Sequence, residues 1–209
     1  IQGIERLAAA GVRHGGPGRL PGAGGAVREL RAPLHHHDGG AAGLHDASRE
    51  QDLLLQHDII VFQHPFYWYS TPAILKEWQD LVLENGWAYG TDGTKLNGKF
   101  LMNAISTGGG EDAYRERGRN RFEMVELLRP FDQTAHLCGM AWLEPFVIHA
   151  GRAMEQGRLS GHAEQYRELI AGLRDGRINP MKHLAPGHAL SERFVLAGKL
   201  KATEARHAS

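Results

Sequence analysis

The sequence predicts an α/β protein in which a parallel β-sheet lies between two layers of helices. From residue 48 onward, apolar segments of strand length alternate with segments that show the 3.6-residue period of amphipathic helices. The strand segments 58–64 and 98–107 are apolar almost throughout, as expected for strands that are covered on both faces. This alternation is typical of a three-layer architecture with helices on both faces of one sheet.

The first elements follow one another at short spacing. We expect a helix over 48–57 with Ser48 as its N-cap, and then the strand 58–64. The next helix should cover 72–86, because Pro72 suits a first helical turn and Gly86 suits a helix end.

The second half of the pattern begins with the strand 98–107. A helix over 122–139 follows, and Pro130 should kink or break it because proline lacks the backbone N–H. The strand 140–150 and an amphipathic helix from Ser160 to Leu173 complete the predicted sheet and its covering layers.

The chain divides into three parts by composition. Residues 1–47 are rich in Gly, Ala, Arg and His and show no sustained period, so we expect them to be mostly irregular, with a short helix near 2–11. Residues 48–174 form the α/β domain. Residues 175–209 read as a linker followed by a loosely attached C-terminal helix.

Charge and hydropathy exclude several classes of partner. Lys plus Arg (24) equals Asp plus Glu (24) in this chain of 209 residues, so no overall field favours nucleic acid or an anionic membrane. No apolar run approaches the roughly 20 residues of a membrane helix, and no signal peptide is evident, which predicts a cytoplasmic protein.

The single cysteine, Cys138, is expected to be a buried structural thiol. The triplet 35–37, HHH, is expected to be a solvated loop, and we predict no metal site.

Two loops at the carboxyl ends of neighbouring strands form the candidate ligand site. Phe66 to Tyr69 are four consecutive aromatic residues after the strand 58–64 and Pro65, and consecutive rings point in too many directions to be buried together. The glycine-rich turn 106–110 follows the strand 98–107 and can bring backbone N–H groups close to a ligand. Both loops should meet at one crevice. Two simpler interpretations remain open: the rings only pack on the next helix or a partner subunit, and the glycines form an ordinary turn.

Four segments in order resemble one family. They are VFQHPFYWYSTPAILKEWQDLVLENGWAYG (61–90), LNGKF (96–100), AISTGGGEDAY (104–114) and CGMAWLEPF (138–146). Together they resemble the flavodoxin-like NAD(P)H dehydrogenase (quinone) family, and most of all its branch of ancillary subunits of glutathione-regulated potassium-efflux systems. The resemblance covers about 48–172 and implies a flavodoxin-like fold.

The resemblance also implies a flavin site for FMN or FAD, with NAD(P)H as co-substrate. In relatives, the position of Trp68 lines the pocket that nicotinamide and quinone occupy in turn, and that of Tyr114 lies near the flavin. A histidine usually follows that tyrosine six residues later, and Asn120 stands there in this chain, so that charge stabilisation would be weaker or come from Arg119 or Arg121. The residues that the resemblance assigns to the cofactor are Pro65, Phe66, Tyr67, Trp68, Tyr69, Ser106, Thr107, Gly108 and Gly109. Those that it assigns to catalysis are Tyr114, Trp68 and Asn120.

One feature of the family is absent upstream. Its members begin with an apolar strand ending in His-Pro and a loop that binds the flavin phosphate, and residues 1–47 contain neither. The first strand of the sheet therefore has no obvious candidate. We hypothesise that 1–47 is a coding region read in the wrong frame or a mis-joined fragment, which an uninterrupted reading frame on resequencing would dismiss.

The resemblance implies a flavin-dependent oxidoreductase that reduces quinones, acting as a homodimer. The alternative function is a regulatory subunit that activates a glutathione-gated potassium-efflux antiporter with little or no redox activity. In that case the protein would bind the antiporter's cytoplasmic domain and lie peripherally at the inner membrane.

Overall fold

One parallel sheet organises the protein. The computed structural model describes residues 26–31, 46–150 and 155–207. The strands run in the order β1-β2-β3-β4, and β5 also pairs with β3, all in parallel. Their bounds are Val27–Arg31 (β1), Ile59–Pro65 (β2), Phe100–Ser106 (β3), Ala141–Trp142 (β4) and Phe146–Ile148 (β5). The predicted parallel α/β sheet is confirmed.

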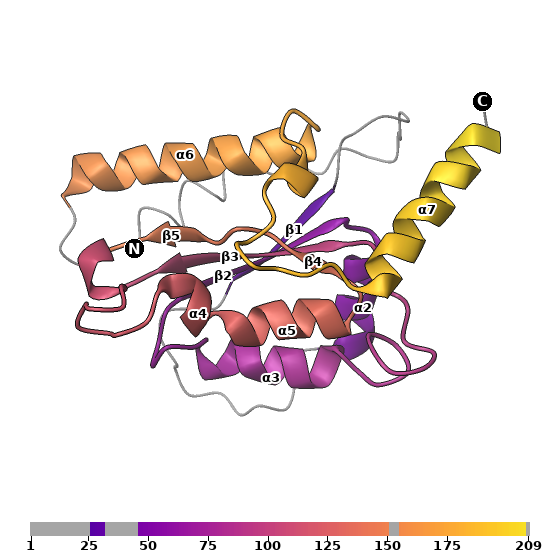
Figure 1. Cartoon of the computed structure of the whole chain (residues 1–209), viewed down its shortest axis with the longest axis horizontal. Helices are drawn as coiled ribbons and strands as arrows, with labels where there is room; N and C mark the ends of the chain where they lie inside the picture. Colours follow the sequence, from indigo (N-terminus) through magenta and orange to yellow (C-terminus); the bar gives the residue numbers. More distant parts are fainter. Residues whose placement is uncertain (1–25, 32–45, 151–154, 208–209) are drawn as a thin grey trace.

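Helices cover both faces of the sheet (Figure 1). The long helix α6 lies on one face, and α2, α3, α4 and α5 lie on the other. Their bounds are Ala47–Leu55 (α2), Ala73–Val82 (α3), Met124–Leu127 (α4), Arg129–Leu137 (α5), Gln156–Arg174 (α6) and Glu192–His207 (α7). The three-layer prediction is therefore also confirmed.

Alternate residues of the central strands build two cores. On one face, Phe62 of β2 packs edge-on against Trp78 of α3 and Phe131 of α5, with ring centroids 5.6 and 6.2 Å apart. On the other face, Val61 of β2 and Met102 of β3 pack against α6. Each buried strand thus supplies one face to each core, which explains why its sequence is apolar without alternation.

Several predicted boundaries were wrong. The N-cap of α2 is Asp46 rather than Ser48, because the Asp46 side chain accepts a hydrogen bond from the N–H of Arg49. Helix α3 ends at Val82, short of Gly86. The helix expected over 122–139 is broken next to Pro130, as predicted: two helices meet at Leu128, and Pro130 lies in the first turn of the second, where its missing N–H costs nothing.

The sheet contains a strand in the segment predicted to be irregular. Strand β1, Val27–Arg31, pairs in parallel with β2, and Val27 lies opposite Ile59. The expectation that 1–47 is mostly irregular missed this strand, which lies at the end of the described strand order and does not end in His-Pro. The short helix expected near 2–11 and the triplet 35–37 lie outside the described residues. The strand expected over 140–150 is interrupted between β4 and β5.

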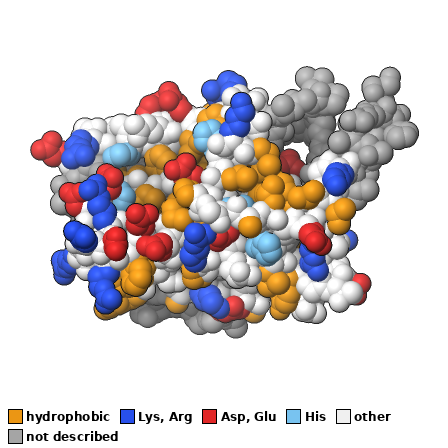
Figure 2. Space-filling view, in the orientation of Figure 1, with side chains coloured by type: hydrophobic (Ala, Val, Ile, Leu, Met, Phe, Trp, Pro, Cys, Tyr) orange, Lys and Arg blue, Asp and Glu red, His pale blue; other side chains and the backbone are white. Residues whose placement is uncertain are grey.

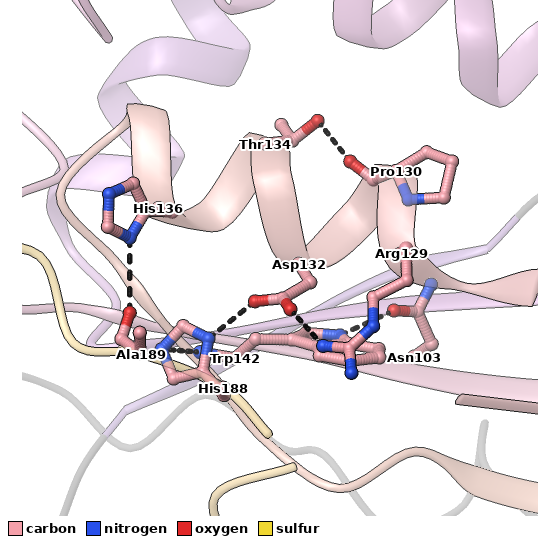
Figure 3. Close-up of polar contacts among 9 residues, drawn as sticks. All are labelled: Asn103, Arg129, Pro130, Asp132, Thr134, His136, Trp142, His188 and Ala189. Atoms are coloured by element: carbon pink, nitrogen blue, oxygen red, sulfur yellow. Dashed lines mark hydrogen bonds and ion pairs between the residues drawn. The ribbon is translucent and has the colours of Figure 1, made fainter. Parts of the chain in front are cut away.

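The segment predicted to be a linker packs against the domain. Ala185 is buried in the core, and the Ala185 N–H donates to the Trp142 carbonyl at 3.0 Å. The His188 side chain is fully buried, and it joins Asp132 of α5 to the Trp142 N–H of β4 (Figure 3). The C-terminal helix α7 follows and projects from the body of the protein (Figure 1).

The surface shows no separation of charge by sign on the face in view. Basic and acidic side chains are interspersed there, with apolar side chains between them (Figure 2). In the part of the chain that the structure describes, every helix is too short or too polar to cross a membrane.

Candidate functional site

The ends of three strands meet at the carboxyl edge of the sheet. Pro65, the last residue of β2, lies opposite Ser106, the last residue of β3, and Ser106 lies opposite Ile148 of β5. The Phe66 N–H donates to the Ser106 carbonyl, and the Thr107 N–H donates to the Ile148 carbonyl, both at 2.9 Å. The aromatic loop and the glycine turn therefore begin side by side, as predicted.

The aromatic loop is a tight hairpin turn that exposes its two central rings. Tyr67 and Ser70 exchange backbone hydrogen bonds of 3.1 and 2.9 Å, and between them Trp68 and Tyr69 have φ angles of 49° and 61°. Positive φ is unfavourable for bulky side chains, and such strain gathers at functional sites. The Trp68 side chain is 93% exposed, so packing of its ring does not offset the strain of the backbone.

The glycine turn presents donors without partners. The N–H groups of Gly108, Gly109 and Gly110 donate no hydrogen bond to any described residue. The turn is held from behind by Thr107, which is buried and whose hydroxyl donates to the Gly109 carbonyl at 2.8 Å. Consecutive free amides of this kind favour an acceptor-rich or anionic ligand.

Both loops line one cavity of about 450 Å³, which is in the range of small-molecule sites. The segment after the glycine turn, 111–120, lines a further side. The lining residues are Phe66, Trp68, Tyr69, Gly108, Gly109, Gly110, Ala113, Tyr114, Arg119 and Asn120. Four aromatic residues, three consecutive glycines, one asparagine and one arginine, with one alanine, thus line the same space.

Ring contacts set the inner wall of the cavity. Phe66 packs edge-on against Tyr69 and against Tyr114, with ring centroids 6.2 Å apart in each pair. The Tyr69 hydroxyl donates to the Asn120 side-chain oxygen at 3.3 Å. This hydrogen bond links the aromatic turn to the segment on the far side of the glycine turn, and it closes the outer rim.

His149 supports this wall from outside the cavity lining. Its ring lies 5.4 Å from the Tyr114 ring, and its Nδ1 lies 3.4 Å from the Thr107 hydroxyl. Burial lowers the pKa of His149, and the nearby Glu111 carboxylate opposes that shift while His162 adds to it. His149 is therefore favoured as a neutral group that fixes Tyr114 and the glycine turn.

The structure brings most, but not all, of the predicted site residues together. Phe66, Trp68, Tyr69, Gly108, Gly109, Tyr114 and Asn120 line the cavity. Pro65, Tyr67, Ser106 and Thr107 do not line it, and they hold the two loops through strand pairing and backbone hydrogen bonds.

Two lining residues were not among the predicted site residues, and a third, Arg119, was considered only as a possible source of positive charge. Gly110 and Ala113 line the cavity beyond the predicted motif, and Arg119 lines it whereas Arg121 does not. The run of glycines in the sequence could have indicated Gly110. No sequence period orients Ala113 or Arg119, because their segment contains only a three-residue 3-10 turn.

Comparisons with known proteins show which family the chain resembles. A family model described as a flavodoxin-like fold matches residues 23–170. The glutathione-regulated potassium-efflux system ancillary protein KefG of Enterobacter sp. (strain 638) is 48% identical over 126 residues, which are 60% of this chain and 69% of that protein.

Solved structures show the same likeness. The general stress protein 14 of Treponema denticola in complex with FMN is 37% identical, with a TM-score of 0.59 over 63% of this chain and 75% of that one. An NADPH-quinone reductase from P. pentosaceus is 33% identical, with a TM-score of 0.58 over 61% and 75%. A protein from Streptomycin violaceusniger described as a thermophilic tryptophan halogenase is 47% identical, with a TM-score of 0.59 over 60% and 73%.

Proposed function

The chain belongs to the flavodoxin-like family, and on this premise we propose that it is a flavin-dependent NAD(P)H oxidoreductase that reduces quinones or similar electrophiles. The observation that carries the proposal is the cavity itself. Aromatic rings from the turn after β2 and unpartnered amides from the turn after β3 face one space of about 450 Å³. A planar, acceptor-rich ring system needs both kinds of wall.

The residues present fit a flavin ring. The N–H groups of Gly108, Gly109 and Gly110 are free to donate to ring oxygens and nitrogens, which otherwise would be costly to desolvate. Phe66 and Tyr114 supply an apolar inner wall, and Trp68 supplies an exposed ring on which a second planar molecule can stack. We propose FMN rather than FAD, with support from the FMN complex of the Treponema denticola relative.

When bound, the flavin would supply the hydride chemistry, and the protein would supply binding, orientation and electrostatics. Trp68 would orient the nicotinamide of NAD(P)H and then the quinone, one after the other. The Tyr114 hydroxyl would donate a hydrogen bond at the inner wall. Asn120, whose side-chain oxygen accepts from Tyr69, would hold the aromatic turn closed over the ligand.

A matched pair of variants at Gly110 tests the amide wall. Gly110 has φ −69°, which proline adopts, and a Cβ at this position would meet no atom within 4 Å. Gly110→Pro therefore removes one N–H with little strain, whereas Gly110→Ala keeps it. We expect Gly110→Pro to weaken FMN binding by about ten-fold, the loss of one hydrogen bond to a buried polar group. Gly110→Ala should bind as the unmodified protein does.

The measurement is direct. The protein is incubated with FMN and gel-filtered, and bound flavin is read by absorbance near 450 nm. The quinone-dependent oxidation of NADPH and NADH is then followed. Colourless protein without turnover would contradict the proposed function. Equal flavin affinity of the Pro and Ala variants would contradict the role of the amide.

A second function is favoured by the relatives and by Trp68. The KefG protein at 48% identity is an ancillary protein of a potassium-efflux system, and a strained, 93% exposed tryptophan also suits a protein contact. We propose as the alternative that the chain is a regulatory subunit that binds an antiporter's cytoplasmic domain. It would then be a cytoplasmic protein held at the inner membrane by its partner.

One comparison separates the two functions. The same preparation is used for co-purification with the antiporter's cytoplasmic domain and for NADPH–quinone turnover. Co-purification without turnover favours the regulatory function, and turnover without co-purification favours the enzyme. We also propose that the chain is a homodimer, which sedimentation equilibrium would test.

A further inference from the structure

One charged side chain faces the cavity, and neither proposed function uses it. Among the ten lining residues, Arg119 alone carries a full charge, and no carboxylate lines the cavity. Arg119 forms no ion pair with any described Asp or Glu. A guanidinium keeps its charge at every pH that the protein meets, so the described lining of the cavity carries one positive charge and no negative one.

The acidic residues nearest to Arg119 in sequence are Glu116 and Glu123, and neither forms an ion pair with it. Glu111 and Asp112 lie in the same segment as Arg119, and both pair with Arg115, at 3.6 and 2.9 Å. Arg115 thus engages both of these carboxylates, and no carboxylate of the described residues pairs with Arg119. The free N–H groups of Gly108, Gly109 and Gly110 add further donors to the same cavity.

The exposure of the lining residues places Arg119 at the outer rim. Phe66 and Tyr114 are half-buried at the inner wall, whereas Trp68, Tyr69 and Arg119 are exposed. Asn120 fixes the segment of Arg119 to the aromatic turn through its contact with Tyr69. Arg119 thus shares the rim with the exposed Trp68 ring, outside the wall that the proposed flavin would occupy.

We infer that Arg119 is a specificity-determining residue that selects aromatic substrates bearing an anionic group next to the ring. The ring would stack on Trp68, and the anionic group would pair with the guanidinium, whose planar fork suits carboxylate, sulfonate and phosphate oxygens. The anionic substrate could be the hydride donor, through its phosphate, or the acceptor, through an acidic substituent. This inference rests on the proposed function for the identity of the substrate, but not for the binding preference.

The binding preference is measured without turnover. Equilibrium dialysis compares naphthalene-2-sulfonate with the uncharged 2-naphthalenemethanol, with and without FMN. We expect the protein to prefer the sulfonate by about five-fold, the value of a solvent-exposed ion pair of about 1 kcal/mol. The preference should vanish in Arg119→Gln, persist in part in Arg119→Lys, and decrease at 0.5 M NaCl.

Arg117→Gln is the matched control. Arg117 is also exposed and lies two residues away, but it does not line the cavity. An unchanged preference in Arg119→Gln, or an equal loss in Arg117→Gln, would overturn the inference. Because Arg119 is exposed, the thermal midpoint of each variant should stay unchanged, which separates loss of selectivity from loss of fold.

Turnover then identifies the source of the anion. Reduced nicotinamide mononucleotide against reduced nicotinamide riboside tests the donor, and 1,4-naphthoquinone-2-sulfonate against 1,4-naphthoquinone tests the acceptor. For each pair, the ratio is kcat/KM of the anionic compound divided by that of the uncharged one. Arg119 selects the anionic member of the pair for which this ratio falls about five-fold in Arg119→Gln. If neither ratio changes in an active protein, the specificity role is wrong. A protein without turnover that keeps its sulfonate preference would refute the proposed enzyme and leave this inference standing.

Discussion

His188 Nδ1 lies 2.5 Å from Asp132 Oδ1, although the two residues are 56 positions apart in the sequence (Figure 3). His188 Nε2 accepts the Trp142 N–H at 3.2 Å, so the proton of the neutral ring is on Nδ1 and is donated to Asp132. Asp132 also accepts from Arg129 at 2.7 Å. A fully buried imidazole thus fastens the segment before α7 to α5 and to the sheet.

We expect His188→Ala to destabilise the protein by about 2 kcal/mol, because it leaves the buried Trp142 N–H without an acceptor. His136→Ala is the control. His136 also bonds this segment, with Nδ1 3.1 Å from the Ala189 carbonyl, but it is exposed, and water can replace the lost contact. Urea unfolding measures both variants. Equal free energies of unfolding would show that burial of His188 contributes nothing.

The sequence predicted the layers of the fold, because buried strands and amphipathic helices have strong periods. It could not predict contacts that depend on distant residues. Strand β1 has the sequence VRELR, and only Leu30 is buried in the core, since an edge strand is held by backbone pairing rather than by apolar side chains. The segment of His188 read as a linker because its contacts with the domain are a few scattered residues, such as Ala185 and His188, that show no helix or strand period.

The candidate site likewise contains parts that the sequence predicted and parts that it could not predict. The aromatic run and the glycine turn were predictable, because parallel strands bring their carboxyl ends to one edge. The hairpin at Trp68 and Tyr69 was not, because its positive φ angles contradict the preferences of both residues. Arg119 lines the cavity from an irregular segment, whose direction only tertiary contacts determine.

Burial of His64 predicts a pH-dependent stability. His64 donates from Nδ1 to the Pro65 carbonyl at 3.0 Å, and Asn103 donates to its Nε2 at 3.4 Å. Burial lowers its pKa from 6.5 to about 4, while the hydrogen bond to Pro65 opposes this shift. His64 therefore binds a proton more readily in the unfolded chain than in the folded protein. Above pH 6.5 His64 is neutral in both states and the free energy of unfolding is at its full value, and it decreases as the pH falls from 6.5 towards 4.

The expected loss over that range is about 3 kcal/mol. Urea unfolding at pH 7, 5.5 and 4.5 measures it, and His64→Gln, which cannot titrate, is the comparison. The free energy of unfolding of His64→Gln should change less between pH 7 and 4.5 than that of the unmodified protein. Parallel pH profiles for the two proteins would refute the assignment to His64.

Thr107 should affect ligand binding through the glycine turn rather than by contact. It is buried, does not line the cavity, and its hydroxyl donates a hydrogen bond to the Gly109 carbonyl at 2.8 Å. Thr107→Val keeps the shape and loses this hydrogen bond, so we expect about 1 kcal/mol of destabilisation and weaker FMN binding. Thr107→Ser keeps the hydroxyl and should restore the flavin affinity. A Ser variant as weak in FMN binding as the Val variant would point to the methyl group instead.

We expect one substitution in the aromatic turn to raise the free energy of unfolding and to lower quinone turnover. Trp68 has φ 49° and is 93% exposed, so its ring contributes little packing to offset the strained backbone. Asparagine tolerates this conformation, and Trp68→Asn should therefore raise the free energy of unfolding by about 1 kcal/mol. The same change removes the ring on which the substrate would stack, and quinone kcat/KM should fall by at least about ten-fold.

Phe122→Asn is the control, because Phe122 is 48% exposed, has no positive φ and does not line the cavity. Its kcat/KM should stay unchanged. If Trp68→Asn lowers stability, the ring is held by a contact that repays its strain, and the turn is not an open platform for ligands.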